Sequence, residues 1–146
     1  MADFLTKQAR SAHMARIRRA NTKPELVVRS MLHRLGYRFR IQLGGVPGRP
    51  DVAFAGRHKA IFVHGCFWHA HDGCPTWRLP KTRRAFWRKK FEKNKERDAR
   101  LLSDAKNAGW KCLVVWECET RDQVKLSSRL VRYLGPSRLS ASRTSL

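Results

Sequence analysis

Acidic residues are scarce in this chain of 146 residues. Only 11 Asp and Glu stand against 32 Lys and Arg, which leaves a formal net charge of +21. Counterions or a polyanion must neutralise such a charge, and nucleic acid is the commonest polyanionic partner. A ribosomal or packaging protein would share this composition, so the charge indicates the partner and leaves the activity open.

Long apolar runs and a secretory leader are also lacking. No apolar run approaches the roughly 18 residues that span a bilayer, so we expect no membrane partner. Residues 1–19 lack the apolar centre of a secretory signal, although their basic character leaves an organellar transit peptide as a minor alternative. We therefore expect a reducing, cytoplasmic compartment. There, the four cysteines favour metal binding over disulfides.

Helical and strand patterns alternate along residues 21–135, which we expect to form one domain. The spacing of apolar residues predicts helices over 23–35, 82–108 and 123–134, and strands over 37–42, 51–55, 59–63 and 110–117. Residues 1–20 form a basic N-terminal arm or helix, and residues 136–146 a disordered tail, in this prediction. The long helix between two apolar strands indicates a right-handed crossover joining parallel strands. The predicted fold class is α/β, a small mixed sheet flanked by helices.

The crossover predicts a metal site. Cys66 and Cys118 each follow the end of one parallel strand, so both thiols reach the same edge of the sheet. His71 and Cys74 lie in the loop after Cys66 and complete a set of three cysteines and one histidine, which suits structural zinc. His69 is also within reach, and ordinary buried thiols are the alternative. Cys112 lies too far along its strand and is expected in the core.

A second group of residues suggests hydrolytic chemistry. A hairpin centred near Arg57 would place Asp51 opposite Val63, close to a cluster of histidines. Hydrolysis of a phosphodiester needs a divalent cation and a base active near neutral pH, for which histidine is suited. Asp51 taken alone is equally well explained as a turn or cap residue.

Several motifs in a fixed order carry a family resemblance. PGRPDVAF, AIFVHGCFWHAHDGC, TRRAFWRKKFEKNKERD and GWKCLVVWEC, after an N-terminal RSAHMARIR, closely resemble the very-short-patch-repair DNA mismatch endonucleases. The resemblance covers residues 10–118. It implies a fold similar to the type II restriction endonucleases, with a structural zinc site. It also implies magnesium-dependent nicking of one strand of double-stranded DNA, immediately 5′ of the mispaired thymine in a T·G mismatch left by deaminated 5-methylcytosine.

The same resemblance implies roles for individual residues. Asp51 and the backbone carbonyl of Val63 bind magnesium, His69 is the base, and Asp98 orients it. His64 contacts or protonates near the scissile phosphate, and Glu25 supports the hydration shell of the magnesium. Glu25 has a local explanation too, because Thr22 to Glu25 has the form of a capping box. The four zinc ligands are those derived above.

Recognition of the mismatch is expected from aromatic side chains. Wedging an aromatic ring between base pairs costs less at a mismatch, and the resemblance gives this role to Phe67 and Trp68, with Met14 entering from the opposite groove. The further DNA-binding candidates are Trp87, Lys90 and Asn94. Cover over the zinc is the alternative for the first pair, and plain core is the alternative for Trp87. A monomer is expected, since only one strand is nicked, and so is a bacterial, nucleoid-associated location in the cytoplasm. The resemblance also implies that mismatch-repair proteins can stimulate the enzyme.

Three departures from the family pattern bear on these roles. Val63 stands where relatives can carry threonine, and the loop HAHDGC is one residue longer than in some relatives. An acid-x-Lys element of related nucleases is replaced by Val63-His64-Gly65, which leaves base catalysis to histidine. Two rival interpretations stay open: a non-catalytic zinc-structured nucleic-acid-binding protein, and a nuclease that cuts a fully paired sequence.

Overall fold

The structure is a computed structural model, and it describes residues 22–41, 43–75 and 77–137. The predicted N-terminal arm with Met14, and most of the predicted tail, lie outside these residues. The described helices and strands run in the order α2 (Lys23–Arg34), β1 (Val52–Phe54), β2 (Lys59–His64), α3 (Arg84–Asn107), β3 (Lys111–Trp116) and α4 (Gln123–Leu134), with short 3-10 helices at Ala55–Arg57 (η1) and Glu117–Arg121 (η2).

The three strands form one mixed sheet in the order β1-β2-β3. Strand β1 pairs with β2 antiparallel, and β2 pairs with β3 in parallel. The 24-residue helix α3 makes the crossover between the two parallel strands. The prediction of a small mixed sheet with a long crossover helix is therefore confirmed.

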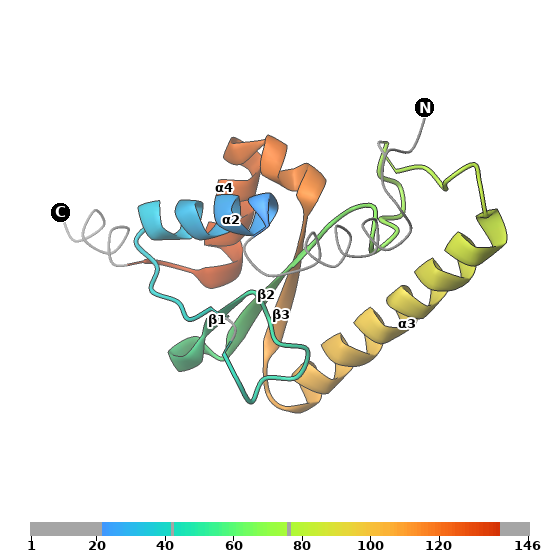
Figure 1. The fold of residues 1–146 in the computed structure, drawn as a ribbon. Helices are drawn as coiled ribbons and strands as arrows, with labels where there is room; N and C mark the ends of the chain where they lie inside the picture. The colour runs from blue at the N-terminus through green and yellow to red at the C-terminus, as the bar shows by residue number, and fades with distance from the viewer. Residues whose placement is uncertain (1–21, 42, 76, 138–146) are drawn as a thin grey trace.

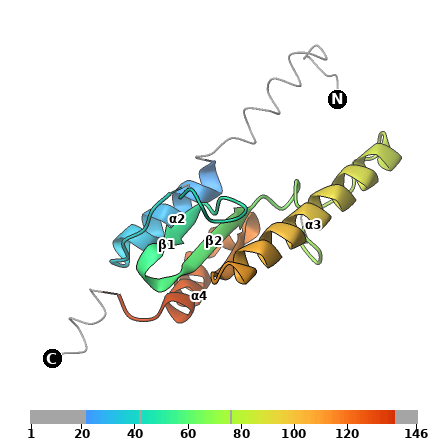
Figure 2. The ribbon, with the colours of Figure 1, turned by 90° about the horizontal axis from the view of Figure 1, so that it is seen from below.

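Helices α2 and α4 lie on one side of the sheet and α3 on the other (Figure 1). Alternate strand residues supply the core under α2 and α4. Its buried members are Val28, Met31, Leu32, Tyr37, Val52, Phe54, Ile61, Val115, Leu126, Leu130 and Leu134. Only Phe91 and Ala105 of α3 are buried, because the N-terminal part of this helix extends beyond the sheet (Figure 2). Helix α3 is thus an exposed arm on which basic side chains are displayed.

Three local expectations need correction. Of the strand predicted over 37–42, the described residues 37–41 form only an isolated bridge between Arg40 and Ala53; β1 is three residues long and η1 follows it at Ala55, so little partner strand is available. Thr22 makes no side-chain capping hydrogen bond, so its half of the capping box is absent. The hairpin register pairs Val52 with Ile61, one residue away from the predicted register.

The shifted register follows from the turn. Three residues in η1 and the left-handed His58 (φ 52°) connect the strands, instead of a tight turn centred on Arg57. No helix among the described residues is long and apolar enough to cross a membrane.

Candidate active site and metal centre

The register of the parallel strands builds the site. His64, the last residue of β2, pairs with Trp116, the last residue of β3. A cysteine stands two residues beyond the end of each strand, Cys66 after β2 and Cys118 after β3, so the two thiols lie side by side at this edge. The backbone N–H of Cys118 donates to the sulfur of Cys66 at 3.4 Å. One edge of the sheet therefore carries both histidine and cysteine chemistry.

The loop after Cys66 folds back to complete the cluster. The N–H of His71 donates to the carbonyl of Cys66 at 3.0 Å, and that of Cys74 to the carbonyl of His71 at 3.2 Å. Ala70 allows this path by adopting a left-handed conformation (φ 46°). The ligand atoms of Cys66, His71, Cys74 and Cys118 all lie within 4.8 Å of one another. The choice between His69 and His71, which the sequence left open, goes to His71 as the member of this cluster.

The distances in the cluster fit a tetrahedral zinc ion. His71 Nδ1 lies 3.6 Å from the sulfur of Cys66 and 3.6 Å from that of Cys118. Zinc–nitrogen and zinc–sulfur bonds at tetrahedral angles place the two ligand atoms about 3.5 Å apart. Burial raises the pKa of the Cys66 thiol to about 12 and also raises the pKa of Cys118, so a bound cation is needed to keep these thiols ionised. Cys112 is half-buried away from the cluster.

The carboxylates of Asp51 and Glu25 form a second centre on the adjacent part of the sheet. Oδ2 of Asp51 accepts a hydrogen bond of 2.6 Å from the N–H of Val63. Burial, and to a smaller extent the neighbouring Glu25, raise the pKa of Asp51 to about 6, although the Val63 hydrogen bond and Arg29 act to lower it. Glu25 is itself buried and accepts from Arg29 at 3.2 Å. The carboxylates of the buried Glu25 and the half-buried Asp51, with an incompletely balanced negative charge, suit a hard divalent cation.

Two histidines and Asp98 of α3 lie beside the carboxylates. His69 Nδ1 is 2.5 Å from Oδ2 of Asp98. The rings of His64 and His69 stack with centroids 3.9 Å apart and an interplanar angle of 4°. Burial, and then the charge of His69, lower the pKa of His64 to about 4, so its ring is neutral at pH 7. A carboxylate accepts only, so Asp98 keeps the proton of His69 on Nδ1 and leaves Nε2 able to take another.

These groups share a cavity of about 360 Å³. Its lining includes Glu25, Asp51, Val63, His64, His69 and Asp98. Arg49 and Arg97, which the sequence interpretation missed, also line it. Arg49 (φ 47°) follows Gly48, at which a Cβ would come within 3.1 Å of both Leu101 and Phe62. Two sequence features could have indicated these arginines. Arg49 lies in the turn PGRPD, two residues before Asp51, and Arg97 is the neighbour of Asp98 on the long helix.

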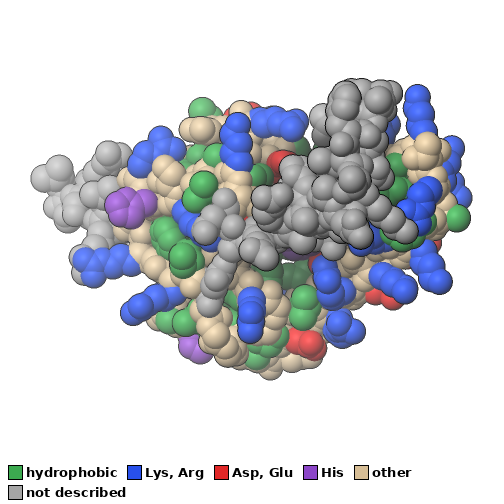
Figure 3. Space-filling model, in the orientation of Figure 1, with side chains coloured by type: hydrophobic (Ala, Val, Ile, Leu, Met, Phe, Trp, Pro, Cys, Tyr) green, Lys and Arg blue, Asp and Glu red, His purple; other side chains and the backbone are tan. Residues whose placement is uncertain are grey.

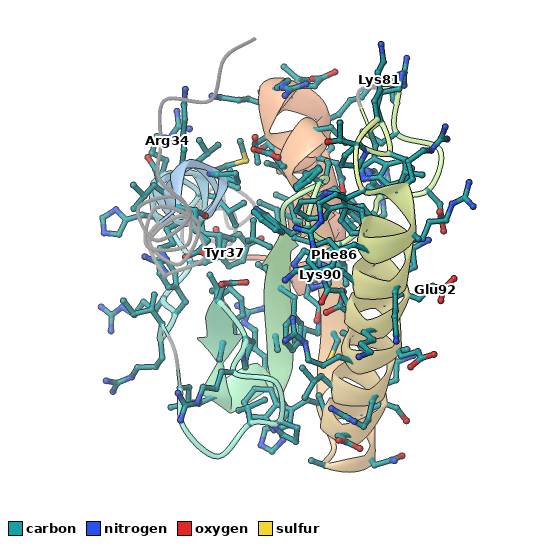
Figure 4. The ribbon with its side chains drawn as sticks, turned by 45° about the vertical axis from the view of Figure 1, so that its right-hand side comes forward. Arg34, Tyr37, Lys81, Phe86, Lys90 and Glu92 are labelled. Atoms are coloured by element: carbon teal, nitrogen blue, oxygen red, sulfur yellow. The ribbon has the colours of Figure 1, made fainter. Side chains whose placement is uncertain are left out.

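A cluster of aromatic rings opens beside this cavity. Phe67 contacts Trp68, Trp87 and Phe91 with centroids 4.9 to 5.5 Å apart. A second cavity of about 580 Å³ runs from Glu25 and His69 to Phe67, Trp68 and Asn94. Two of the remaining DNA-binding candidates lie on α3 next to this cluster. Asn94 Nδ2 donates to the carbonyl of Trp68 at 2.9 Å. Lys90 is half-buried on the side of α3 that faces the strands, whereas Glu92 points away (Figure 4).

Basic side chains surround the site. Figure 3 shows Lys and Arg scattered over this face and gathered along α3, with few acidic groups between them. The acidic residues of the cavity therefore lie inside a positively charged surface. Such a surface attracts a polyanion, and the cavity provides oxygen donors for a cation.

Comparison with known proteins agrees with the motifs. The sequence model of the family described as DNA mismatch endonuclease Vsr matches residues 2–75. The type II nicking enzyme V.XorIIP of Xanthomonas oryzae pv. oryzae is 45% identical over 137 residues, which cover 94% of this chain and 100% of that protein. The DNA mismatch endonuclease Vsr of Escherichia coli K12 is 42% identical over 127 residues, covering 87% and 81% of the two chains. The chain belongs to the DNA mismatch endonuclease Vsr family.

Proposed function

We propose that this protein nicks double-stranded DNA on one strand, 5′ of the mispaired thymine of a T·G mismatch, with Mg²⁺ at the active site and structural Zn²⁺. The observation that carries the proposal is the shared cavity, in which Asp51, Glu25, His64, His69 and Asp98 lie together next to half-buried aromatic rings. A binding module without catalysis would not need the 2.5 Å contact between His69 and Asp98 or the two carboxylates of Asp51 and Glu25 beside it.

The proposed base is His69. Asp98 holds the proton of His69 on Nδ1, so that Nε2 accepts the proton of the attacking water and the carboxylate stabilises the resulting imidazolium. His64 is neutral at pH 7 and contacts the scissile phosphate, whose negative charge favours its protonated form. Arg49 and Arg97 at the cavity wall supply further positive charge near that phosphate.

Asp51 and the carbonyl of Val63 would hold Mg²⁺, with Glu25 supporting the water around it. When bound, this cation supplies stabilisation of charge on the phosphoryl oxygens. The hydrogen bond from the Val63 N–H fixes one oxygen of Asp51, and the second oxygen would be the one to hold the cation. Cys66, His71, Cys74 and Cys118 would hold Zn²⁺, which ties the loop carrying Phe67, Trp68 and His69 to the ends of β2 and β3.

Mismatch selectivity is assigned to the aromatic cluster and the N-terminal arm. Insertion of Phe67 and Trp68 unstacks a base step, which costs a few kcal/mol in paired DNA and less at a mismatch. Trp87 supports these rings from α3. Asn94, which already holds the carbonyl of Trp68, and Lys90 lie next to the inserted rings. Met14 of the arm (residues 1–20) enters from the opposite groove in this proposal.

The proposed fold, oligomeric state and cellular location are consistent with this activity. The mixed sheet with a site at one edge supports a fold similar to the type II restriction endonucleases, with residues 21–135 as the endonuclease domain and 136–146 as a tail. One site that nicks one strand is consistent with a monomer. A DNA substrate places the protein in the cytoplasm with the bacterial nucleoid, where mismatch-repair proteins are candidate partners.

A strand-resolved cleavage assay tests the proposal. Labelled duplexes with T·G or fully paired T·A are incubated with Mg²⁺ or without divalent cation, using wild type and Asp51→Asn. We expect a Mg²⁺-dependent nick only in the T-bearing strand of the T·G duplex, absent in Asp51→Asn. Equal cutting of both duplexes would identify a sequence-specific nuclease instead, and tight binding with no cutting would leave a binding module.

A further inference from the structure

The indole of Trp116 contacts both groups of side chains to which the proposed function gives separate tasks. It stacks on the ring of His71 in the cysteine–histidine cluster, with centroids 3.9 Å apart and an interplanar angle of 7°. It also packs edge to face against two further rings. The ring centroid of His64 lies 5.2 Å away at an interplanar angle of 80°, and that of His69 lies 6.3 Å away at 76°. A single side chain therefore lies against both the metal cluster and the catalytic histidines.

The backbone of Trp116 is held by two interactions, and the second of them is itself supported from α4. The parallel register pairs it with His64. Its N–H donates to Glu119 Oε1 at 3.0 Å, and Arg129 of α4 donates to both oxygens of Glu119 at 2.5 Å. The indole is thus a fixed surface, and the rings that pack on it take their orientation from it.

We propose that Trp116 is a positioning residue that holds the His71 ring in the plane in which its Nδ1 faces the cysteine thiols. Through the same indole, binding of a metal ion to the cluster orders the stacked rings of His64 and His69. The proposal rests on the assignment of the cluster as a zinc site. A stacked plane removes the rotation of the His71 ring about its side-chain bonds. The same indole closes one edge of the stacked histidines, so disorder at the cluster is transmitted to the proposed base.

Two consequences follow for a chain without the indole. Mutation of a residue that orients a metal ligand typically lowers metal affinity or activity about 10- to 100-fold. We therefore expect a loss of about this size in Zn²⁺ affinity when the indole is removed. Single-turnover nicking by the zinc-loaded chain should also slow, because His69 is less well positioned. DNA affinity should stay unchanged, because phosphate contacts by the basic surface supply most of it.

The chain offers a matched control at the opposite end of β3. Trp110 stacks on His58 with centroids 5.1 Å apart and an interplanar angle of 15°. Neither residue belongs to a group of described side chains that could hold a metal. Trp110→Leu therefore removes a tryptophan–histidine stack next to the same strand, far from the cluster.

The experiment measures Zn²⁺ affinity of the full chain by competition with a chromophoric chelator. Wild type, Trp116→Phe, Trp116→Leu and Trp110→Leu are compared, with Co²⁺ spectra as a probe of ligand geometry and circular dichroism as a test of folding. Should Trp116→Leu not fold, Trp116→Met fills the volume without a ring plane. Because the competition needs no nicking activity, failure of the proposed nicking in wild type would leave this measurement intact.

The expected result is a 10- to 100-fold loss of Zn²⁺ affinity and a changed Co²⁺ spectrum in Trp116→Leu, with Trp116→Phe and Trp110→Leu close to wild type. Single-turnover nicking of zinc-loaded Trp116→Leu should be slower at unchanged DNA affinity. Wild-type Zn²⁺ affinity in Trp116→Leu, or an equal loss in Trp110→Leu, would overturn the positioning role. Full nicking by zinc-loaded Trp116→Leu would overturn the link to the histidine pair.

Discussion

Replacement of Asp98 by asparagine tests the proposed base most directly. The 2.5 Å contact between Asp98 Oδ2 and His69 Nδ1 has two effects: it fixes the tautomer and it stabilises the charged ring. Asparagine keeps the size and the hydrogen-bonding capacity of the side chain but removes the negative charge. Its amide can also donate to Nδ1, which moves the ring proton to Nε2 and blocks proton acceptance there.

The expected loss can be worked out from these two effects. A hydrogen bond to a charged group is worth about 1.5 to 3 kcal/mol, which corresponds to a rate loss of about 10- to 150-fold when the stabilisation of the imidazolium disappears. If the amide fixes the wrong tautomer, the loss extends toward about 10⁴-fold, the size seen for an aspartate-to-asparagine change in a serine-protease triad. We therefore expect Asp98→Asn to lower the single-turnover rate at least 10-fold, with DNA affinity unchanged.

The assay is single-turnover nicking of the T·G duplex, with DNA affinity measured in parallel without Mg²⁺. Asp104→Asn is the matched control, because Asp104 is exposed on the same helix and its replacement changes the net charge equally. The variant His69→Ala should be no less impaired than Asp98→Asn, and the double variant should lose little more than His69→Ala alone. A rate for Asp98→Asn within threefold of Asp104→Asn would refute the assignment of His69 as a base oriented by Asp98.

Three further predictions concern stability and metal binding. Burial, with the neighbouring Glu25, raises the pKa of Asp51 from 3.8 to about 6, so the folded chain binds a proton there that the unfolded chain releases. His64, whose pKa is lowered to about 4, acts in the opposite direction over the same pH range, so the test compares wild type with Asp51→Asn. In the zinc-loaded, magnesium-free protein Asp51→Asn should melt higher than wild type at pH 7, and this difference in melting temperature should shrink as pH falls through 6 toward 4. Gly48→Ala should lower the free energy of unfolding by about 1 to 3 kcal/mol, because φ at Gly48 is +82° and the added Cβ would come within 3.1 Å of Leu101 and Phe62. The control Gly44→Ala, which has open space around the added Cβ, should be near neutral. Urea denaturation measures both. Cys74→Ser should lose Zn²⁺ and melt at lower temperature, whereas Cys112→Ser should keep its Zn²⁺, as measured by metal content after dialysis and by thermal melting.

Topology was the part of the fold that the sequence predicted well. A long helical pattern between two apolar runs fixes a parallel pair, and parallel strands end at the same edge. The meeting of Cys66 with Cys118 follows from that rule, and the structure confirms it. Residue spacing could not decide between His69 and His71, because the choice depends on the left-handed turn at Ala70 that directs the two side chains to different neighbours.

Side-chain direction limited the rest of the prediction. The hairpin register was wrong by one residue because a 3-10 turn replaced a tight turn, yet Asp51 still reaches Val63 through its side chain. Trp116 was assigned only to an apolar strand, since its pattern does not show which rings pack on it. Arg49 and Arg97 enter the cavity through a left-handed turn and a helix face, and neither is distinguished by composition in a chain rich in arginine.

The charge distribution gives the proposed metal requirement a physical basis beyond stabilisation of the reacting phosphate. The net charge of +21 draws DNA toward the molecule, but the cavity proposed to receive the scissile phosphate contains the neighbouring carboxylates of Asp51 and Glu25. A phosphate approaching buried carboxylates is repelled, and burial strengthens that repulsion. A divalent cation on Asp51 would reverse the sign of the local field, so Mg²⁺ should favour binding of the phosphate in the cavity as well as increase the rate of cleavage.

With Asp51→Asn, which removes one of these charges, binding of an uncleaved T·G duplex in the absence of Mg²⁺ should become tighter, while nicking is lost. Equal binding by wild type and Asp51→Asn without Mg²⁺ would show that the carboxylates do not oppose entry of the phosphate.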